Sequence, residues 1–300
     1  EKRRGRLRMG KWFGDGMVLQ SRTRDGKGAA LYGLEALGSL VTVTVESYNL
    51  RSQPTSKYRI YPNENGEWRL MLKPRAPSRD IYRITIKGTR TLTAQNVQFG
   101  DVYMFSGQSN MELPLGITIG YRGLKGEIKR LMDHTPNTTH SHHANFSTTS
   151  NTPTESLLGA QGKIPWFKLF YVARGVSNKA EFDIPEASDT CPGTCNKWLT
   201  IDQIGLDKFS GVGYFSAINL AKFDAGGSMD WPIGVILSTW GSSEINSWVD
   251  THKCPDSDNS MQSRSLAAMG NAMVAPLTQL SKRGFIWYQG ESDGYKHHTT

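Results

Sequence analysis

Short runs of apolar residues, each ending in a cluster of small and polar residues, set the pattern of the chain beyond residue 100. Four such runs span residues 102–106, 166–173, 231–238 and 284–288. Continuous rather than alternating apolar character is typical of parallel strands that are covered on both faces. The pattern therefore predicts an α/β domain whose sheet contains these segments.

The residues before this part follow a different pattern. Segments 41–45 and 82–86 alternate between apolar and polar residues, and turn sequences such as 63–67 separate the predicted strands. Several short strands without a helical period predict a small β-sandwich domain over residues 13–99. We expect it to pack beside the second domain, residues 100–300, and a sugar-binding module is the alternative. A basic stretch without periodicity precedes both, and we expect these residues, 1–12, to be disordered.

Two segments have apolar residues that recur at the spacing of a helix face. A helix is predicted from about Gly213 to Lys222, and a second one over residues 261–280. The expected buried faces consist of Tyr214, Ala217, Ile218 and Ala221 in the first helix and of Leu266, Met269, Met273 and Leu277 in the second. The first of these faces is expected to cover the sheet.

The first apolar run leads directly into Gly107-Gln108-Ser109-Asn110, a sequence that cannot continue a strand comfortably. In open α/β sheets, ligands bind outside the carboxyl ends of the strands, where the chain turns towards a helix. A serine at that turn has an exposed hydroxyl, and nearby backbone N–H groups can face developing negative charge. Ser109 is therefore a candidate nucleophile, and the alternative is that it only caps a helix.

The turns that follow the other runs contain further candidates. Gly241 follows the run 231–238, and Gln289 follows the run 284–288. Because the carboxyl ends of parallel strands meet at one edge of a sheet, we expect these residues to lie near Ser109. A nucleophile that faces backbone and amide donors is the layout that acyl transfer requires.

Three sequence blocks occur in a fixed order: Ser-Gly-Gln-Ser-Asn-Met-Glu at 106–112, Pro-Ile-Gly-Val-Ile through Trp-Gly at 232–241, and Trp-Tyr-Gln-Gly-Glu-Ser-Asp at 287–293. Together they resemble the sialate O-acetylesterase family, which belongs to the SGNH-type hydrolases. Residues 13–20 also resemble the start of this family, where a β-rich domain precedes the catalytic one. The resemblance implies a flavodoxin-like, three-layer α/β hydrolase domain that works without a cofactor.

The resemblance also implies an activity and a set of roles. The protein is expected to be a serine esterase that hydrolyses O-acetyl esters of sialic acids or related acetylated sugars. Ser109 would be the nucleophile, and the oxyanion hole would consist of the backbone N–H groups of Ser109 and Gly241 and the side-chain amide of Gln289.

Polar residues beside these candidates are expected to support them. Asn110, Glu291 and Asp293 would form hydrogen bonds that hold the turns in place. A glycosidase-like acid–base pair of Glu291 and Asp293 is the alternative, although no second carboxylate marks the far side of a sugar site.

The base is the missing part of this pattern. In the family, an Asp-x-x-His pair follows the next strand, and no such pair occurs after residue 293. His297 and His298 follow Gln289 too closely, and no carboxylate is set beside His252. We therefore expect the chain to be an amino-terminal part of a longer protein, incomplete at its carboxyl end and inactive by itself. The alternative is a non-catalytic carbohydrate-binding or structural relative that lacks the histidine.

The charge of the chain argues against a nucleic-acid partner. The net charge is +8, but five of the 35 Lys and Arg residues lie within residues 2–8 and the others are scattered. A mildly basic surface suits anionic sugars such as sialic acids. No stretch approaches the roughly 18 consecutive apolar residues of a membrane helix, so we expect no membrane span.

The cysteines and the polar segments do not predict a metal site, but they bear on the compartment in which the protein is found. Cys191 and Cys195 could form a disulfide bond, and Cys254 could pair with one of them instead. Neither these cysteines nor the histidines of the polar loop 133–156 have metal-ligand spacing, so no metal is predicted. Asn137 and Asn145 are in glycosylation sequences. We expect a secreted or lysosomal glycoprotein.

Overall fold

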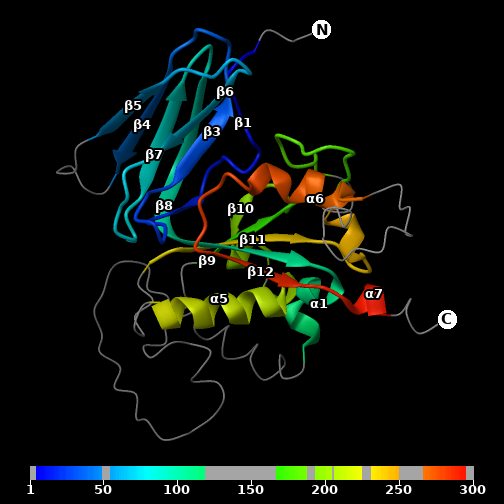
Figure 1. The fold of residues 1–300 in the computed structure, drawn as a ribbon. Coiled ribbons are helices and arrows are strands. Elements are labelled where there is room, and N and C mark those ends of the chain that lie inside the picture. Colours follow the sequence, from blue (N-terminus) through cyan, green and yellow to red (C-terminus); the bar gives the residue numbers. More distant parts are fainter. Residues whose placement is uncertain are drawn as a thin grey trace, which may run out of the picture.

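The structure is a computed structural model that describes residues 5–48, 55–118, 167–187, 193–204, 206–224, 231–249 and 266–294. It is a mixed α/β structure dominated by sheets, as the sequence predicts (Figure 1). The strands are β1 (Arg8–Met9), β2 (Val18–Gln20), β3 (Ala30–Leu34), β4 (Val41–Ser47), β5 (Ser56–Ile60), β6 (Glu67–Met71), β7 (Tyr82–Lys87), β8 (Thr91–Gly107), β9 (Phe167–Tyr171), β10 (Trp198–Thr200), β11 (Ile233–Thr239) and β12 (Gly284–Tyr288). The α-helices are α1 (Ser109–Glu112), α4 (Ile201–Ile204), α5 (Gly211–Asp224), α6 (Ala268–Met273) and α7 (Glu291–Gly294). Short 3-10 helices span Leu115–Ile117, Leu206–Lys208, Ile245–Ser247 and Ala275–Leu277.

Strand β8 is the element that joins the two parts of the chain. Its first half pairs antiparallel with β7, which continues to β4 and β5. Its second half pairs in parallel with β11 on one side and β12 on the other. A separate sheet contains β1, β3 and β6 (Figure 1). The expected domain boundary between residues 99 and 100 falls inside β8, so a separate β-sandwich domain stays a prediction.

The four apolar runs all form strands of one parallel sheet. The order across this sheet is β9, β11, β8 and β12, and β10 is added antiparallel to the outer edge of β9. The prediction of these four strands is confirmed. The short strand β10 was not predicted, because three residues in an irregular stretch carry no readable period.

Side chains on the two faces of β8 enter two different cores. Tyr103 and Phe105 pack in one cluster with Tyr214 of α5, whereas Met104 packs in the other with Met273 of α6. Figure 1 shows α5 and α6 on opposite sides of the parallel strands. Burial of each large apolar side chain stabilises the fold by about 1.5–3 kcal/mol. Cover on both faces explains why this strand reads as a continuous apolar run.

The two predicted helices differ in how well they match the structure. Helix α5 forms where it was expected, and Tyr214 and Ala217 are buried. Helix α6 is much shorter than the predicted range 261–280, so that prediction is wrong in its length. Ala267 has a left-handed backbone with φ of 58° at the start of α6, and Pro276, which lacks an N–H group, lies just beyond its end. Residues 261–265 lie outside the described residues.

Residues 5–12 are ordered, in contrast to the expectation of a disordered tail. Leu7 and Trp12 are fully buried, and β1 pairs with β3. The backbone N–H of Lys11 donates to Asp183 Oδ1 at 2.7 Å, and its Nζ donates to Asp183 Oδ2 at 3.0 Å. The apolar residues interspersed among the basic ones anchor this segment. No helix of the described residues is long and apolar enough to cross a membrane.

Lys282 gives the fold a pH dependence that can be measured. Its Nζ donates to the carbonyl oxygens of Leu277 and Leu280 at 2.7 and 2.9 Å, and burial lowers the pKa of Lys282 to about 8. In the unfolded chain the pKa of a lysine is about 10.4. Between pH 8 and 10 the unfolded chain therefore binds more protons, so the contribution of Lys282 to the free energy of unfolding rises with pH.

We expect the variant Lys282→Met to lose this rise. Denaturant unfolding at several pH values between 7 and 10 measures it, with Lys57→Met, at an exposed lysine, as the control. An unfolding free energy that varies with pH equally in Lys282→Met and in the wild type would contradict the lowered pKa.

Candidate active site

Gly107 joins the ends of three adjacent strands, β8, β11 and β12. Its φ is +141°, and a Cβ atom at this position would lie 1.9 Å from the carbonyl oxygen of Tyr288, so only glycine fits. The N–H of Gln108 donates to the same carbonyl at 3.1 Å. The N–H of Trp240 donates to the carbonyl oxygen of Gly107, also at 3.1 Å. These bonds hold the three following turns side by side.

The candidate residues Ser109, Gly241 and Gln289 come directly after these three strand ends. A Cβ atom added to Gly241 would lie 3.7 Å from the Cβ of Ser109, so the two turns lie close together. The amide of Gln289 contacts Gln108, the neighbour of Ser109, at 3.3 Å. The three residues are therefore brought to one edge of the sheet, and their catalytic roles stay predictions.

Ser109 is the first residue of α1 and is exposed. The residue at the N-cap position is Gln108, and its side chain forms no capping hydrogen bond. The alternative that Ser109 is a helix cap is therefore wrong. Gln108 is instead buried, and its Oε1 accepts from the Nε2 of Gln289 at 3.3 Å and from the N–H of Gly290 at 3.4 Å.

The N–H of Gly241 is already used by a protein acceptor. It donates to Oε2 of Glu112 at 2.8 Å, and Oε1 of Glu112 pairs with the guanidinium of Arg174. An oxyanion donor must point at the developing charge, and this N–H points at a carboxylate. Sequence reasoning missed Glu112, although it lies three residues after Ser109 in the same helical turn.

The side-chain amide of Gln289 is held by three acceptors. Its Nε2 contacts a carboxylate oxygen of Asp293, the carbonyl oxygen of Ser243 at 3.3 Å and Oε1 of Gln108 at 3.3 Å. An amide group has two hydrogens to donate, so these contacts fix its orientation. The two contacts at 3.3 Å are at the long end of hydrogen-bond lengths.

Glu291 and Asp293, both in α7, bind the turns on either side. Asp293 accepts from the N–H of Ile245 at 3.1 Å, in the segment after β11. Oε1 of Glu291 accepts from Nδ2 of Asn110, in the turn after β8. The other oxygen of Glu291 is buried and has no hydrogen-bond partner among the residues that the structure describes. These contacts are of the supporting kind that the sequence predicts for the three residues.

Several predictions concern residues that the structure does not describe. All seven histidines of the chain, His134, His140, His142, His143, His252, His297 and His298, lie outside the described residues, as do Asn137 and Asn145. Cys195 is in a disulfide bond, and both possible partners, Cys191 and Cys254, also lie outside them. Within the described part of the chain, no group of three or more His, Cys, Asp or Glu residues is placed to hold a metal ion.

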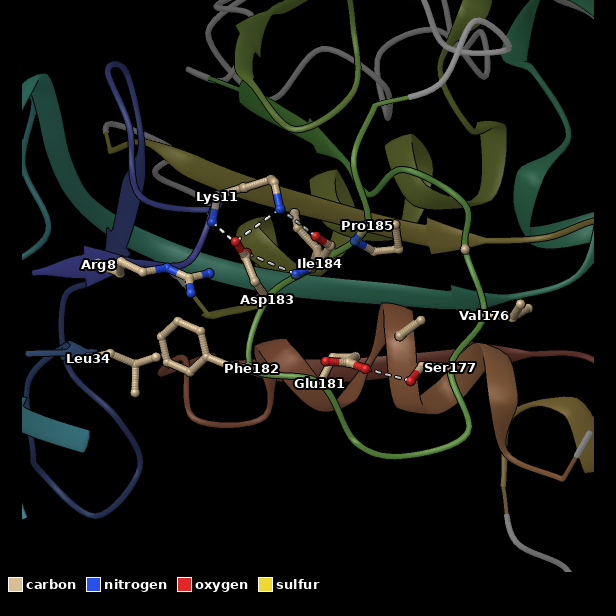
Figure 2. Close-up of a pocket in the computed structure, with 12 residues that line it drawn as sticks. Arg8, Lys11, Leu34, Val176, Ser177, Glu181, Phe182, Asp183, Ile184 and Pro185 are labelled. Atoms are coloured by element: carbon tan, nitrogen blue, oxygen red, sulfur yellow. Dashed lines mark hydrogen bonds and ion pairs between the residues drawn. The ribbon is translucent and has the colours of Figure 1, made fainter. Parts of the chain in front are cut away.

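Figure 2 shows a pocket of about 410 Å³ whose lining contains none of the three candidate residues. It is lined by Arg8, Lys11 and Leu34 from the amino-terminal part, by residues 175–177 and 181–185, and by Ala272 of α6. Burial lowers the pKa of Lys11, but the hydrogen bonds and charges of Asp183 and Glu186 outweigh it and raise that pKa above its usual value. The ion pairs of Lys11 with Asp183 and Glu186 connect the amino-terminal segment to the loop after β9.

Comparison with known proteins gives a consistent result. No family model matches the chain. The sialate O-acetylesterases of Pongo abelii and Homo sapiens are each 23% identical to it over 96% of its length. The chain spans about half the length of these relatives, 49% in both cases.

A solved structure supports the fold. The crystal structure of a carbohydrate acetylesterase from Xanthomonas citri has a TM-score of 0.61 and 22% identity, and the match covers 96% of this chain and 52% of that one. With the sequence blocks at residues 106–112, 232–241 and 287–293, these comparisons confirm that the chain resembles the sialate O-acetylesterase family over nearly its whole length.

Proposed function

We propose that the protein is a serine esterase that removes acetyl groups from O-acetylated sugars, with sialic acids as the first candidates. The observation that carries the proposal is the meeting of Ser109, Gly241 and Gln289 at the carboxyl ends of three adjacent parallel strands. The similarity to proteins named sialate O-acetylesterase and carbohydrate acetylesterase supports the chemistry. Ligands of open α/β sheets bind at this edge.

In the proposed reaction, Oγ of Ser109 attacks the carbonyl carbon of the acetyl ester. A base takes the proton of Ser109, the carbonyl electrons move to the oxygen, and the sugar hydroxyl leaves with a proton as the acyl-enzyme forms. Water then attacks the acyl-enzyme and releases acetate. We assign the base to a histidine outside the described residues.

The donors for the oxyanion are the backbone N–H of Ser109 and the amide of Gln289. The backbone N–H of Gly241, which the sequence also offers as a donor, is bound to Glu112 in this structure. An oxyanion at this position would replace the long contacts of the Gln289 amide to Ser243 and Gln108. The bond to Asp293 would keep the amide in place. A donor that is oriented before the reaction does not need to reorganise as charge develops.

The same proposal includes the fold, a flavodoxin-like domain of the SGNH-type hydrolases, and the compartment in which the protein works. Helices α5 and α6 on opposite sides of the parallel strands support a three-layer hydrolase domain. The disulfide bond of Cys195 supports a secreted or lysosomal protein, because disulfides persist in oxidising compartments.

Acetate release by the full-length protein tests the function. We expect release from O-acetylated sialic acids, and slower release from O-acetylated neutral sugars such as xylose. Release from the neutral sugars alone would overturn the choice of sialic acids. If no substrate released acetate while a glycan array bound the protein, the non-catalytic carbohydrate-binding alternative would replace the esterase.

A further inference from the structure

Glu112 connects the nucleophile turn to the neighbouring turns of the sheet. It is the last residue of α1, three residues after Ser109, and residues at this spacing lie on the same side of a helix. Its Oε2 accepts from the N–H of Gly241 at 2.8 Å, in the turn after β11. Its Oε1 pairs with Arg174, which follows β9. One carboxylate thus links the ends of three strands.

The contacts of Glu112 form a closed ring. The guanidinium of Arg174 lies over the ring of Trp240, 5.6 Å from its centroid, and Trp240 directly precedes Gly241. The ring therefore runs from Glu112 to Arg174, to Trp240, to Gly241 and back to Glu112. In a closed ring, the displacement of one member strains the contacts of the others. The position of the turn after β11 relative to Ser109 consequently depends on Glu112.

An ordinary surface ion pair does not explain this arrangement. The side chains of Glu112 and Arg174 are 33% and 40% exposed, and a pair that is this exposed contributes little by its charges alone. The bond from Gly241 is different, because a backbone N–H that donates to a carboxylate forms a charge-assisted hydrogen bond of good length. The positional constraint of that bond, rather than the ion pair, is the functional part.

We propose that Glu112 is a positioning residue of the esterase, which uses the N–H of Gly241 to hold the Trp240–Gly241 turn against the Ser109 turn. Gly241 is then a structural partner of the nucleophile rather than a donor to the oxyanion. The expected effect on turnover rests on the proposed function. The expected effect on the position of the Trp240–Gly241 turn rests on the contacts alone.

Substitution of Glu112 should change turnover more than substrate affinity. In Glu112→Ala the turn loses its anchor, and a displacement of about 1 Å near the reacting atoms can lower a rate by about 100-fold. We expect kcat to fall about 10- to 100-fold with KM changed less than about threefold. Glu112→Gln keeps an oxygen that can accept from Gly241, so its kcat should stay within about fivefold of the wild type.

Two further variants separate the possible causes. Arg174→Gln removes the ion pair but leaves the bond to Gly241, so it should lower kcat less than Glu112→Ala does. Asp25→Ala is the control, because Asp25 is an exposed carboxylate that pairs with Lys27 at 2.6 Å in a remote loop. It should leave kcat and KM unchanged.

Hydrogen exchange of the Gly241 amide, read by mass spectrometry on the full-length protein without substrate, is the structural measurement. We expect faster exchange at Gly241 in Glu112→Ala and wild-type exchange in Glu112→Gln and Asp25→Ala. Unchanged exchange in Glu112→Ala would overturn the proposal whether or not the protein is an esterase. Wild-type kcat in Glu112→Ala, or a larger loss in Arg174→Gln, would also overturn it. Absence of any acetate release from the wild type would instead reject the proposed function and leave the exchange result to decide on Glu112.

Discussion

Replacement of Ser109 by alanine should lower acetate release by more than about 10³-fold in the full-length protein. Without the hydroxyl no acyl-enzyme forms, and only the oxyanion donors and substrate binding remain to assist water. Because the Ser109 side chain is exposed, the free energy of unfolding should change by less than about 0.5 kcal/mol. Steady-state acetate release and thermal unfolding measure the two effects.

The remote substitution Ser39→Ala is the matched control for Ser109→Ala. It removes the same hydroxyl from a loop in the amino-terminal part and should leave acetate release at the wild-type level. If Ser109→Ala retained even a few per cent of wild-type turnover, Ser109 would not be the nucleophile.

Replacement of Gln289 by alanine should have the second-largest effect. Loss of one oxyanion donor typically lowers kcat by about 10²–10³-fold, which corresponds to roughly 2.7–4 kcal/mol. The amide of Gln289 is fixed by Asp293, Ser243 and Gln108, so it is oriented before the substrate arrives. KM should change little, because the oxyanion exists only in the transition state and the intermediate.

Separate values of kcat and KM for Gln289→Ala decide its role. A raised KM with normal kcat would show that Gln289 binds the substrate equally in its ground and transition states. Asp293→Asn tests the support of the amide, and its kcat should fall less than that of Gln289→Ala because the donor itself remains.

The four parallel strands could be predicted because burial on both faces leaves a direct mark on the sequence. That residues 91–107 form one continuous strand, β8, could not be predicted. Its first residues alternate between exposed and buried positions, whereas every residue from Val97 to Gly107 is buried. A strand that is half covered at one end and fully covered at the other therefore reads as two elements. The ordered residues 5–12 were missed for a related reason, since Leu7 and Trp12 are buried but flanked by basic residues.

The neighbourhood of the candidate site was predictable, and its hydrogen bonds were not. Parallel strands bring their carboxyl ends together, so Ser109, Gly241 and Gln289 could be placed at one edge from sequence alone. Which acceptor takes the N–H of Gly241 depends on the side-chain conformation of Glu112 and on the distant Arg174, and neither follows from a local pattern. The orientation of the Gln289 amide likewise depends on three partners from different turns.

The central claim is that Ser109 is an activated nucleophile, and covalent labelling of the full-length protein with a fluorophosphonate probe tests it most directly. Peptide mapping by mass spectrometry identifies the modified residue. We predict a single labelled serine, Ser109, with labelling abolished in Ser109→Ala and slowed in Gln289→Ala. Labelling at a residue other than Ser109 would contradict the account. Acetate release at the wild-type rate by Ser109→Ala would contradict it as well.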